Sequence, residues 1–131
     1  MATLITLPKF SDERGSLVVL DNIHELLPFE VKRIFYIVAD DNAIRGGHRH
    51  KLTKQAAICI KGQCSIFNDN NNIQQEFILD SPEKCLILET FDWHLMHSFS
   101  KDAILLVLAS SSFDAGDYIY DAYKKVEYAA L

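Results

Sequence analysis

The sequence predicts an all-β fold, a sandwich or barrel of short antiparallel strands forming one domain over residues 1–131. The apolar segments are short and rich in β-branched and aromatic residues, which is typical of strands. Polar turns separate them at close spacing, and helical periodicity is almost absent. With 49% hydrophobic and 24% charged residues, the chain can bury one core and is not disordered.

The predicted strands are residues 4–7, 15–20, 33–38, 55–61, 63–68, 74–79, 84–89, 97–99 and 103–109. Gly62 and the Asp/Asn run at 69–72 supply the turn chemistry that reverses a chain between antiparallel strands. Residues 21–27 predict one short helix with Asp21 as its N-cap. A second short helical segment is expected near residues 117–126.

The strand at 55–61 is apolar on both faces, because residues 56–60 carry no polar side chain. A strand covered by the opposite sheet on one side and by a second subunit on the other would have this composition. The pattern therefore favours a homodimer.

Charge and leader composition limit the partners that the chain is expected to have. The formal net charge is −5 and the isoelectric point is near 5.4, which argues against general nucleic-acid binding. No basic leader precedes a long apolar run, and no apolar run approaches a membrane-spanning length. Three cysteines without C-x-x-C spacing indicate reduced thiols, so we expect a cytoplasmic protein with no membrane partner.

Residues 44–51 concentrate two histidines, two arginines and a lysine in an otherwise acidic chain. In an extended strand His48 and His50 point to the same face, roughly 6–7 Å apart. Gly46 and Gly47 leave room for a ligand beside them. The pattern indicates either a metal site or an acid/base site for an anionic substrate.

The spacing around the histidines matches metal-binding jelly-roll proteins of the cupin superfamily. His48 and His50 are followed by four residues, then Gln55, then six residues and Gly62. Gln55 stands where that pattern has a carboxylate ligand, and a neutral amide is a poor ligand for a divalent ion. Nearby cationic side chains would add repulsion. The sequence therefore predicts a cupin scaffold without a metal.

An ordered set of motifs runs through nearly the whole chain, at residues 12–17, 32–37, 45–51, 93–100, 106–110, 113–114 and 117–119. With these motifs the sequence resembles the dTDP-4-oxo-6-deoxyglucose 3,4-ketoisomerases, cupin-fold enzymes of bacterial deoxysugar biosynthesis. The resemblance implies a homodimeric jelly roll that needs no metal and no nicotinamide. It also implies a dTDP-linked 4-oxo-6-deoxy sugar as substrate and a surface glycan such as O-antigen or lipooligosaccharide as destination.

The family reaction moves a ketone from C4 to C3 of the sugar by proton transfer through an enediol. Histidine suits this work because its ordinary pKa, about 6.5, lets it act as base and then as acid near neutral pH. The resemblance implies that His50 is the catalytic base and that His48 is a partner or second proton carrier. It also implies that Tyr36 stabilises the enediolate or relays a proton.

Basic residues are expected to bind the substrate. Arg45 is the first candidate for the pyrophosphate, with Arg33 and Lys51 as further candidates, because a guanidinium fork pairs well with phosphate oxygens. Arg14 and His97 are expected to line the sugar pocket and to determine the configuration at C4. The resemblance favours a galacto-configured product, dTDP-3-oxo-6-deoxygalactose.

Two other histidines are expected outside the chemistry: His94 as a packed structural residue and His24 as a solvated one. Three alternative functions stay open at this point. They are a sugar-nucleotide 3,5-epimerase-like enzyme, which would use a His–Asp pair with a tyrosine acid, a non-catalytic cupin that binds a sugar nucleotide, and a metal-dependent cupin.

Overall fold

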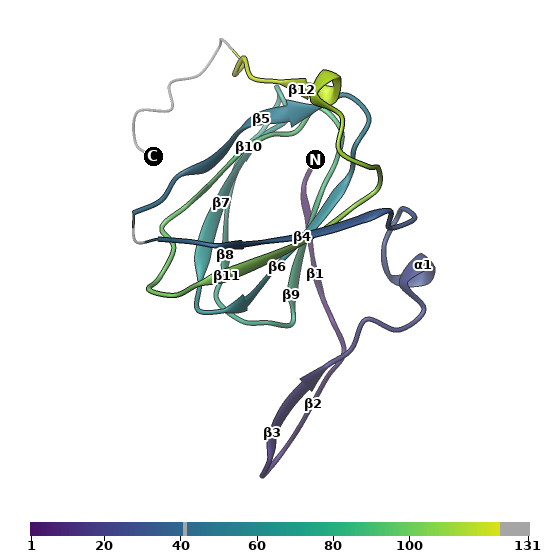
Figure 1. Cartoon of the computed structure of the whole chain (residues 1–131), viewed down its shortest axis with the longest axis vertical. Helices are drawn as coiled ribbons and strands as arrows, with labels where there is room; N and C mark the ends of the chain where they lie inside the picture. Colours follow the sequence, from purple (N-terminus) through teal and green to yellow (C-terminus); the bar gives the residue numbers. More distant parts are fainter. Residues whose placement is uncertain (41, 124–131) are drawn as a thin grey trace.

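Two facing antiparallel sheets form the body of the protein, in a computed structural model that describes residues 1–40 and 42–123 (Figure 1). The first sheet has the order β1 (Thr3–Thr6), β9 (Lys84–Leu88), β6 (Gln55–Lys61), β11 (Ile104–Ala109) and β4 (Arg33–Val38). The second has the order β12 (Tyr118–Ile119), β5 (Arg45–His50), β10 (Trp93–His97), β7 (Cys64–Asp69) and β8 (Gln74–Leu79). The all-β prediction is confirmed.

The main core lies between the two sheets, because alternate residues of each strand point to the same face. Leu105 and Val107 of β11 meet Ile66 of β7 and Met96 of β10 there, all almost fully buried. The predicted bounds of β4, β6 and β8 are confirmed.

The second apolar face of β6 is covered by the chain itself. Ala56 and Ile58 pack there with Leu7 and Leu27 in a second buried cluster. Leu27 follows the single-turn helix α1 (Ile23–Leu26), so the segment around α1 lies over this face. The composition of this strand therefore has an explanation within one chain, and it does not by itself require a second subunit.

Several predicted elements differ in the structure. The N-cap of α1 is Asn22, in the left-handed region at φ 50°, and Asp21 instead accepts a hydrogen bond from the Asn22 N–H. In place of a helix at 117–126 the chain forms a 3₁₀ turn, η1 (Ala115–Asp117), and then β12; residues 124–126 lie outside the described part. The strand predicted at 97–99 ends at His97, because Ser98 takes a φ of 54°.

Two strands stand apart from the body as a hairpin. Within residues 1–40 and 42–123, β2 (Lys9–Asp12) pairs only with β3 (Gly15–Val18), and β2 was not predicted. Figure 1 shows this hairpin extending away from the sheets, at the opposite end from β5 and β12. A bond from the Val19 N–H to the Pro8 carbonyl, 3.0 Å long, closes its base. Among the described residues, no helix is both long enough and apolar enough to span a bilayer.

Candidate active site

A cavity of about 240 Å³ opens between the two sheets, at the side where β4 ends one sheet and β5 and β12 end the other. Its wall combines apolar, aromatic and basic side chains. The lining residues are Phe35, Ile37, Arg45, Gly46, His48, Gln55, Met96 and Tyr118.

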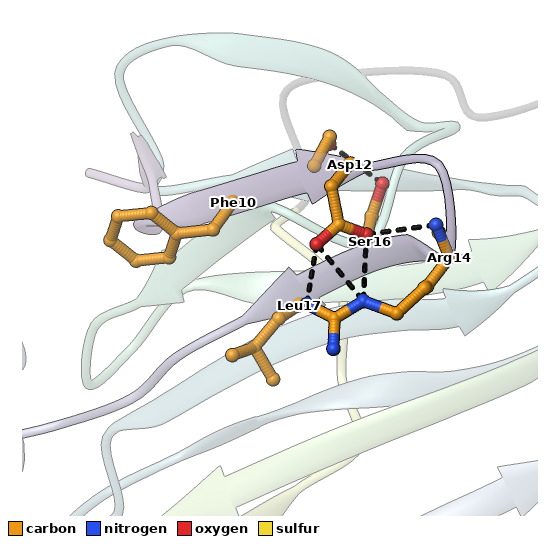
Figure 2. Close-up of a pocket in the computed structure, with 7 residues that line it drawn as sticks. Phe10, Asp12, Arg14, Ser16 and Leu17 are labelled. Carbon is orange, nitrogen blue, oxygen red and sulfur yellow. Dashed lines mark hydrogen bonds and ion pairs between the residues drawn. The ribbon is translucent and has the colours of Figure 1, made fainter.

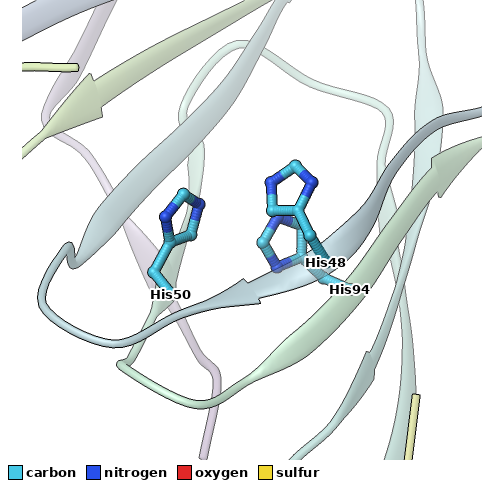
Figure 3. Close-up of side chains that lie close together, drawn as sticks. All are labelled: His48, His50 and His94. Carbon is cyan, nitrogen blue, oxygen red and sulfur yellow. The ribbon is translucent and has the colours of Figure 1, made fainter. Parts of the chain in front are cut away.

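Three histidine rings converge at this cavity (Figure 3). His48 and His50 come from β5, and His94 comes from the neighbouring strand β10, where it pairs with His48. The ring centroid of His48 lies 4.9 Å from each of the other two, and those two are 6.0 Å apart. The predicted pairing of His48 and His50 on one face is confirmed, and His94 joins it.

Gly46 allows this convergence. Its φ is +83°, and a Cβ atom at this position would lie 2.9 Å from the carbonyl oxygen of His94. Only glycine combines this backbone conformation with so close an approach. The absence of a side chain therefore lets β5 come close enough to β10 for the two imidazoles to meet.

His50 is held by a buried carboxylate. Its Nδ1 donates to Asp117 Oδ2 across 2.8 Å, and both side chains are almost completely buried. Nε2 has no hydrogen-bond partner among the described residues. Since Nδ1 carries the proton, Nε2 is the unprotonated nitrogen, and it is free to accept one.

Asp117 is itself fixed by the turn after β5. Its carboxylate accepts hydrogen bonds from the Leu52 N–H at 2.6 Å and the Thr53 hydroxyl at 2.5 Å. Burial raises the pKa of Asp117, but the bonds from Thr53, Leu52 and His50 outweigh burial and leave the pKa below its usual value. The carboxylate is therefore ionised at neutral pH and stabilises His50 in one orientation.

Burial keeps the three imidazoles neutral at pH 7. It lowers the pKa of His94 to about 3 and that of His48 to about 4, with a further contribution from the neighbouring histidines. It also lowers the pKa of His50, although Asp117 opposes this shift and the charge of Arg33 adds to it. Neutral imidazoles in a dry site can accept a proton from a weak carbon acid.

A hydrogen bond at Nδ1 orients the ring of His94, as it does that of His50. His94 Nδ1 donates to the Asp92 carbonyl at 3.0 Å, and the buried Nε2 has no hydrogen-bond partner in the part of the chain that the structure describes. The Oε1 atom of Gln55, on the cavity wall, is also buried and unpartnered within the described chain. Together with His50 Nε2, the site therefore holds three buried acceptor atoms that have no partner among the described residues.

Tyr118 is the aromatic residue that borders the histidines. Its ring centroid lies 4.5 Å from that of His50 and 4.7 Å from that of His48. The strand β12 pairs with the end of β5, Tyr118 opposite His50, and so fixes this contact. The sequence motif at 117–119 contained both Tyr118 and Asp117, but their roles were not predicted.

The predicted basic residues are divided between the cavity and its surroundings. Arg45 lines the cavity and is exposed, as a phosphate-binding residue at a mouth would be. Arg33 lies on the inward side of β4, with its guanidinium over the rings of Phe35 and Phe113, and its charge acts on His50. Lys51 follows β5 as an exposed residue.

Three predicted residues do not lie at this cavity within the chain. Tyr36 points to the outer face of β4 and is 67% exposed, since the alternate residues Phe35 and Ile37 point inward. His97 falls on the opposite face of β10 from His94 and is bonded to Glu76 and to Ser98. Arg14 is at the tip of the separate hairpin, with Asp12.

His94 is buried, as predicted, and lies beside His48, whereas His97 lies on the other face of β10 within the chain. The reason is the register of β10: in a strand, residues three apart point to opposite faces. The strand begins at Trp93, earlier than the predicted strand at 97–99. Placing the strand correctly would have put His94 beside His48 on the cavity side.

The three histidines also satisfy the spacing of a metal site, with ligand atoms within 4.8 Å of one another. The side chains around the three histidines suit a divalent ion poorly. Gln55 brings no charge at the position of a carboxylate ligand, while Arg45 lines the same cavity and Arg33 acts on His50. The donor set therefore suits a neutral acid/base site better than a cation site.

Comparison with known proteins identifies the family. The model of the FdtA family, described as WxcM-like, C-terminal, matches residues 1–130. The chain belongs to this family. It is 42% identical over 125 residues to the TDP-4-oxo-6-deoxy-alpha-D-glucose-3,4-oxoisomerase of Aneurinibacillus thermoaerophilus, covering 93% of this chain and 89% of that protein. The chain is thus an isomerase with sugar-nucleotide 3,4-ketoisomerase activity.

Solved structures agree with this assignment. The WlaRB TDP-quinovose 3,4-ketoisomerase of Campylobacter jejuni is 38% identical with a TM-score of 0.84, covering 92% of each chain. WlaRA, the TDP-fucose-3,4-ketoisomerase of the same organism, is 36% identical with a TM-score of 0.81, covering 92% of this chain and 89% of that one. The ketoisomerase jelly roll is therefore confirmed. This chain is almost equally identical to the two relatives, so overall sequence identity does not favour one of them over the other.

Burial of a neutral His94 predicts a pH dependence of stability. Its folded pKa is about 3, and an unfolded histidine titrates near 6.5. Below about pH 6.5 the unfolded chain binds a proton at this residue that the folded chain does not. The free energy of unfolding therefore decreases, from this residue, by about 1.4 kcal/mol for each unit by which the pH is lowered. In His94→Gln, the free energy of unfolding measured with urea is expected to decrease less than in wild type when the pH is lowered from about 6 to about 5.

The matched control is His24→Gln, because His24 is an exposed residue of α1. This variant is expected to keep the wild-type pH slope. Equal slopes for wild type and His94→Gln would contradict the burial of a neutral imidazole.

Proposed function

We propose that the chain converts dTDP-4-oxo-6-deoxy-D-glucose into a dTDP-3-oxo-6-deoxyhexose by histidine-mediated proton transfer. One observation carries this proposal: a buried, neutral His50 whose Nδ1 is bonded to Asp117 and whose Nε2 is unpartnered. A proton acceptor held in one tautomer and excluded from water is what abstraction of a carbon-bound proton needs. The name of the 42% identical relative supports the substrate.

In the first step His50 Nε2 takes the proton from C3, which the neighbouring C4 carbonyl acidifies. The C3–H electrons form the C3=C4 double bond, and the carbonyl oxygen becomes the enediolate oxygen. Asp117 stabilises the imidazolium that His50 becomes, through the bond at Nδ1. Hydrogen-bond donors at the cavity wall would stabilise the enediolate.

In the second step the proton of the C3 hydroxyl passes to the enediolate oxygen on C4, the C3=C4 electrons form the new C4–H bond with a proton supplied by the imidazolium formed in the first step, after exchange with solvent, and C3 becomes the ketone. The C3–H bond is broken and a C4–H bond is formed, so the sugar oxidises one carbon and reduces the next without a redox cofactor. His48 is the proposed second proton carrier, 4.9 Å from His50 between ring centroids. Tyr118 is better situated than Tyr36 for the tyrosine role, because its ring contacts both histidines.

Arg45 is the proposed partner of the pyrophosphate. It is an exposed guanidinium on the cavity wall, and it can pair with two phosphate oxygens at once. Arg33 and Lys51 would add positive charge near the same region. We propose that the reaction needs neither metal nor nicotinamide, that the protein is a cytoplasmic homodimer, and that residues 1–131 form one domain.

We also propose a galacto-configured product, and we reassign the residue that helps to determine it. The face that receives the proton at C4 depends on the groups around the enediol. His94 lies 4.9 Å from His48 between ring centroids, whereas His97 is bonded to Glu76 on the other face of the sheet. His94 therefore takes the place that the sequence prediction gave to His97.

A 3,5-epimerase is the second candidate, because a specific observation favours it. The His50–Asp117 pair beside Tyr118 is the constellation expected of an epimerase with a tyrosine acid. The 3′-monoepimerase ChmJ of Streptomyces bikiniensis is only 18% identical, however, and its TM-score of 0.79 shows the fold alone. The two activities differ in the carbon that exchanges its proton.

The proposal predicts where solvent deuterium enters the product. In deuterated water, dTDP-4-oxo-6-deoxyglucose should give a 3-oxo product that carries the label at C4, as read by NMR. His50→Asn should lower kcat by about 10²–10⁴-fold, because the proton acceptor is lost. Nucleotide affinity should stay near the wild-type value, since the proposed contact to the pyrophosphate is made by Arg45 and not by His50.

His24→Asn serves as the control, since it removes an exposed histidine. Label at C5 with the ketone still at C4 would establish the epimerase instead. Binding of dTDP without turnover of any 4-oxo sugar nucleotide would favour the non-catalytic cupin, and a stoichiometric transition metal in active protein would favour the metal-dependent one.

A second prediction separates His94 from His97. His94→Gln should change the rate or the C4 configuration of the product, because it alters the surroundings of His48, which lines the cavity. His97→Gln should leave both close to wild type, because its ring is bonded on the other face of β10. NMR of the two products measures this. If His97→Gln changed the C4 configuration of the product and His94→Gln did not, the determining role would belong to His97.

A further inference from the structure

A row of polar side chains continues from the histidine centre across the sheet that contains β5 and β10. In register order across four paired strands, the row consists of His48, His94, Asn68 and Gln75. In an antiparallel sheet, residues directly opposite each other point to the same face. Ile66, two residues before Asn68 on β7, belongs to the main core, so the row faces the interior between the two sheets.

The centre of this row is Asn68, a fully buried amide. Its side chain is 0% exposed, and neither Nδ2 nor Oδ1 is hydrogen-bonded within the part of the chain that the structure describes. The same holds for Nε2 of His94 and Oε1 of Gln75, on either side of it in the row. Buried polar groups are costly without partners, so native proteins satisfy them with protein atoms or ordered water. Four such atoms in neighbouring residues therefore indicate a bound ligand.

A larger hollow of about 310 Å³ lies at the hairpin β2–β3, and it differs from the row in this respect (Figure 2). Its polar side chains are paired with one another. Arg14 donates to Asp12 Oδ2 at 2.5 Å, and the hydroxyl oxygens of Ser11 and Ser16 are 2.8 Å apart. These groups already have partners, whereas the buried atoms of the row need them.

We propose that the row holds a file of ordered water molecules that connects the histidine centre to solvent at β8. Water suits these atoms, because it can donate to Nε2 of His94 and to Oε1 of Gln75 and can both donate to and accept from the Asn68 amide. Neighbouring strands are about 4.8 Å apart, so the row spans roughly 14 Å and has the length of a few water molecules.

Both ends of the water file lie where a proton route needs them. Among the described strands β8 is the last of its sheet, and Gln75 is half-buried there, so this end lies near solvent. At the other end, one nitrogen of each of His48, His50 and His94 lies within 4.8 Å of the others. One water molecule can bridge two atoms at this separation with hydrogen bonds of about 2.8 Å. The water file can therefore reach the ring of His50.

The water file supplies a route for proton exchange during turnover, an inference that rests on the proposed function. A sugar nucleotide with its pyrophosphate at Arg45 would fill the cavity mouth. The His50 imidazolium then passes its Nε2 proton to the first water, each water passes one proton to the next, and one proton enters solvent near Gln75. The reverse sequence returns a solvent proton to Nε2, so only N–H and O–H bonds change. Asn68 is a positioning residue that orients the water in the middle.

The first test asks whether water contacts Asn68, and it needs no substrate. In ¹⁵N-labelled wild type, the two Nδ2 protons of Asn68 should show NMR cross-peaks to water with the sign of a long-lived contact. The corresponding signals should disappear in Asn68→Leu, which confirms their assignment. An Asn68 amide without contact to water, or one bonded directly to His94, would overturn the water file.

The second test follows the hydrogen from C3. Substrate deuterated at C3 is converted in ordinary water by wild type, Asn68→Leu and Gln75→Leu. Wild type should lose the deuterium to solvent in most turnovers, whereas NMR should find it at C4 in most product molecules of both variants, because the route for exchange is lost. Since the proposed base is intact, kcat should stay within about tenfold of wild type. A merely structural role of these residues would lower kcat without changing the origin of the C4 hydrogen.

Gln74→Leu is the matched control, because Gln74 precedes Gln75 on β8 and is exposed. It should lose the deuterium as wild type does. Equal deuterium at C4 in wild type and both row variants would overturn the exchange route, and so would a wild type that retains the deuterium. Two variants at different points of the row keep the test valid if one fails to fold. A wild type inactive with every 4-oxo sugar nucleotide would instead contradict the proposed function, while the contact of Asn68 with water would still decide the water file.

Discussion

The bond between His50 and Asp117 is the interaction on which the arrangement of the site depends. A neutral imidazole has two tautomers, and the carboxylate at Nδ1 selects the one whose Nε2 is unprotonated. Burying an ionised carboxylate is costly unless it is well bonded, and Thr53 and the Leu52 N–H supply those bonds. The loop after β5 therefore stabilises the charge that orients the proposed base.

The fold brings these groups together from distant parts of the sequence. β12 carries Tyr118 alongside His50, and the 3₁₀ turn before it ends at Asp117. β10 supplies His94, and Gly46 lets β5 approach it closely. The cavity thus lies where two sheets meet near their end strands. At this edge a ligand can enter without disturbing the core.

The sequence predicted more of the fold than of the site. Strand periodicity predicted β4, β6 and β8 with their observed bounds, because their hydrophobic patterns and turns are clear. His48 and His50 could be paired from local geometry alone. Asp117 and Tyr118 could not be placed, since their contact with His50 spans 67 residues and depends on a two-residue strand without a hydrophobic pattern. His94 is buried, as expected of a packed residue, but its approach to His48 depends on the register of β10, whose start is not marked by alternation.

The tautomer of His50 tests the central claim most directly. In protein with ¹⁵N-labelled histidine, NMR at pH 7 should show a neutral His50 with its proton on Nδ1 and with Nε2 unprotonated. In Asp117→Asn this preference should weaken, because the amide no longer offers two equivalent anionic acceptors. A wild-type His50 with its proton on Nε2, or an imidazolium at pH 7, would contradict a role as the base that takes the proton from C3.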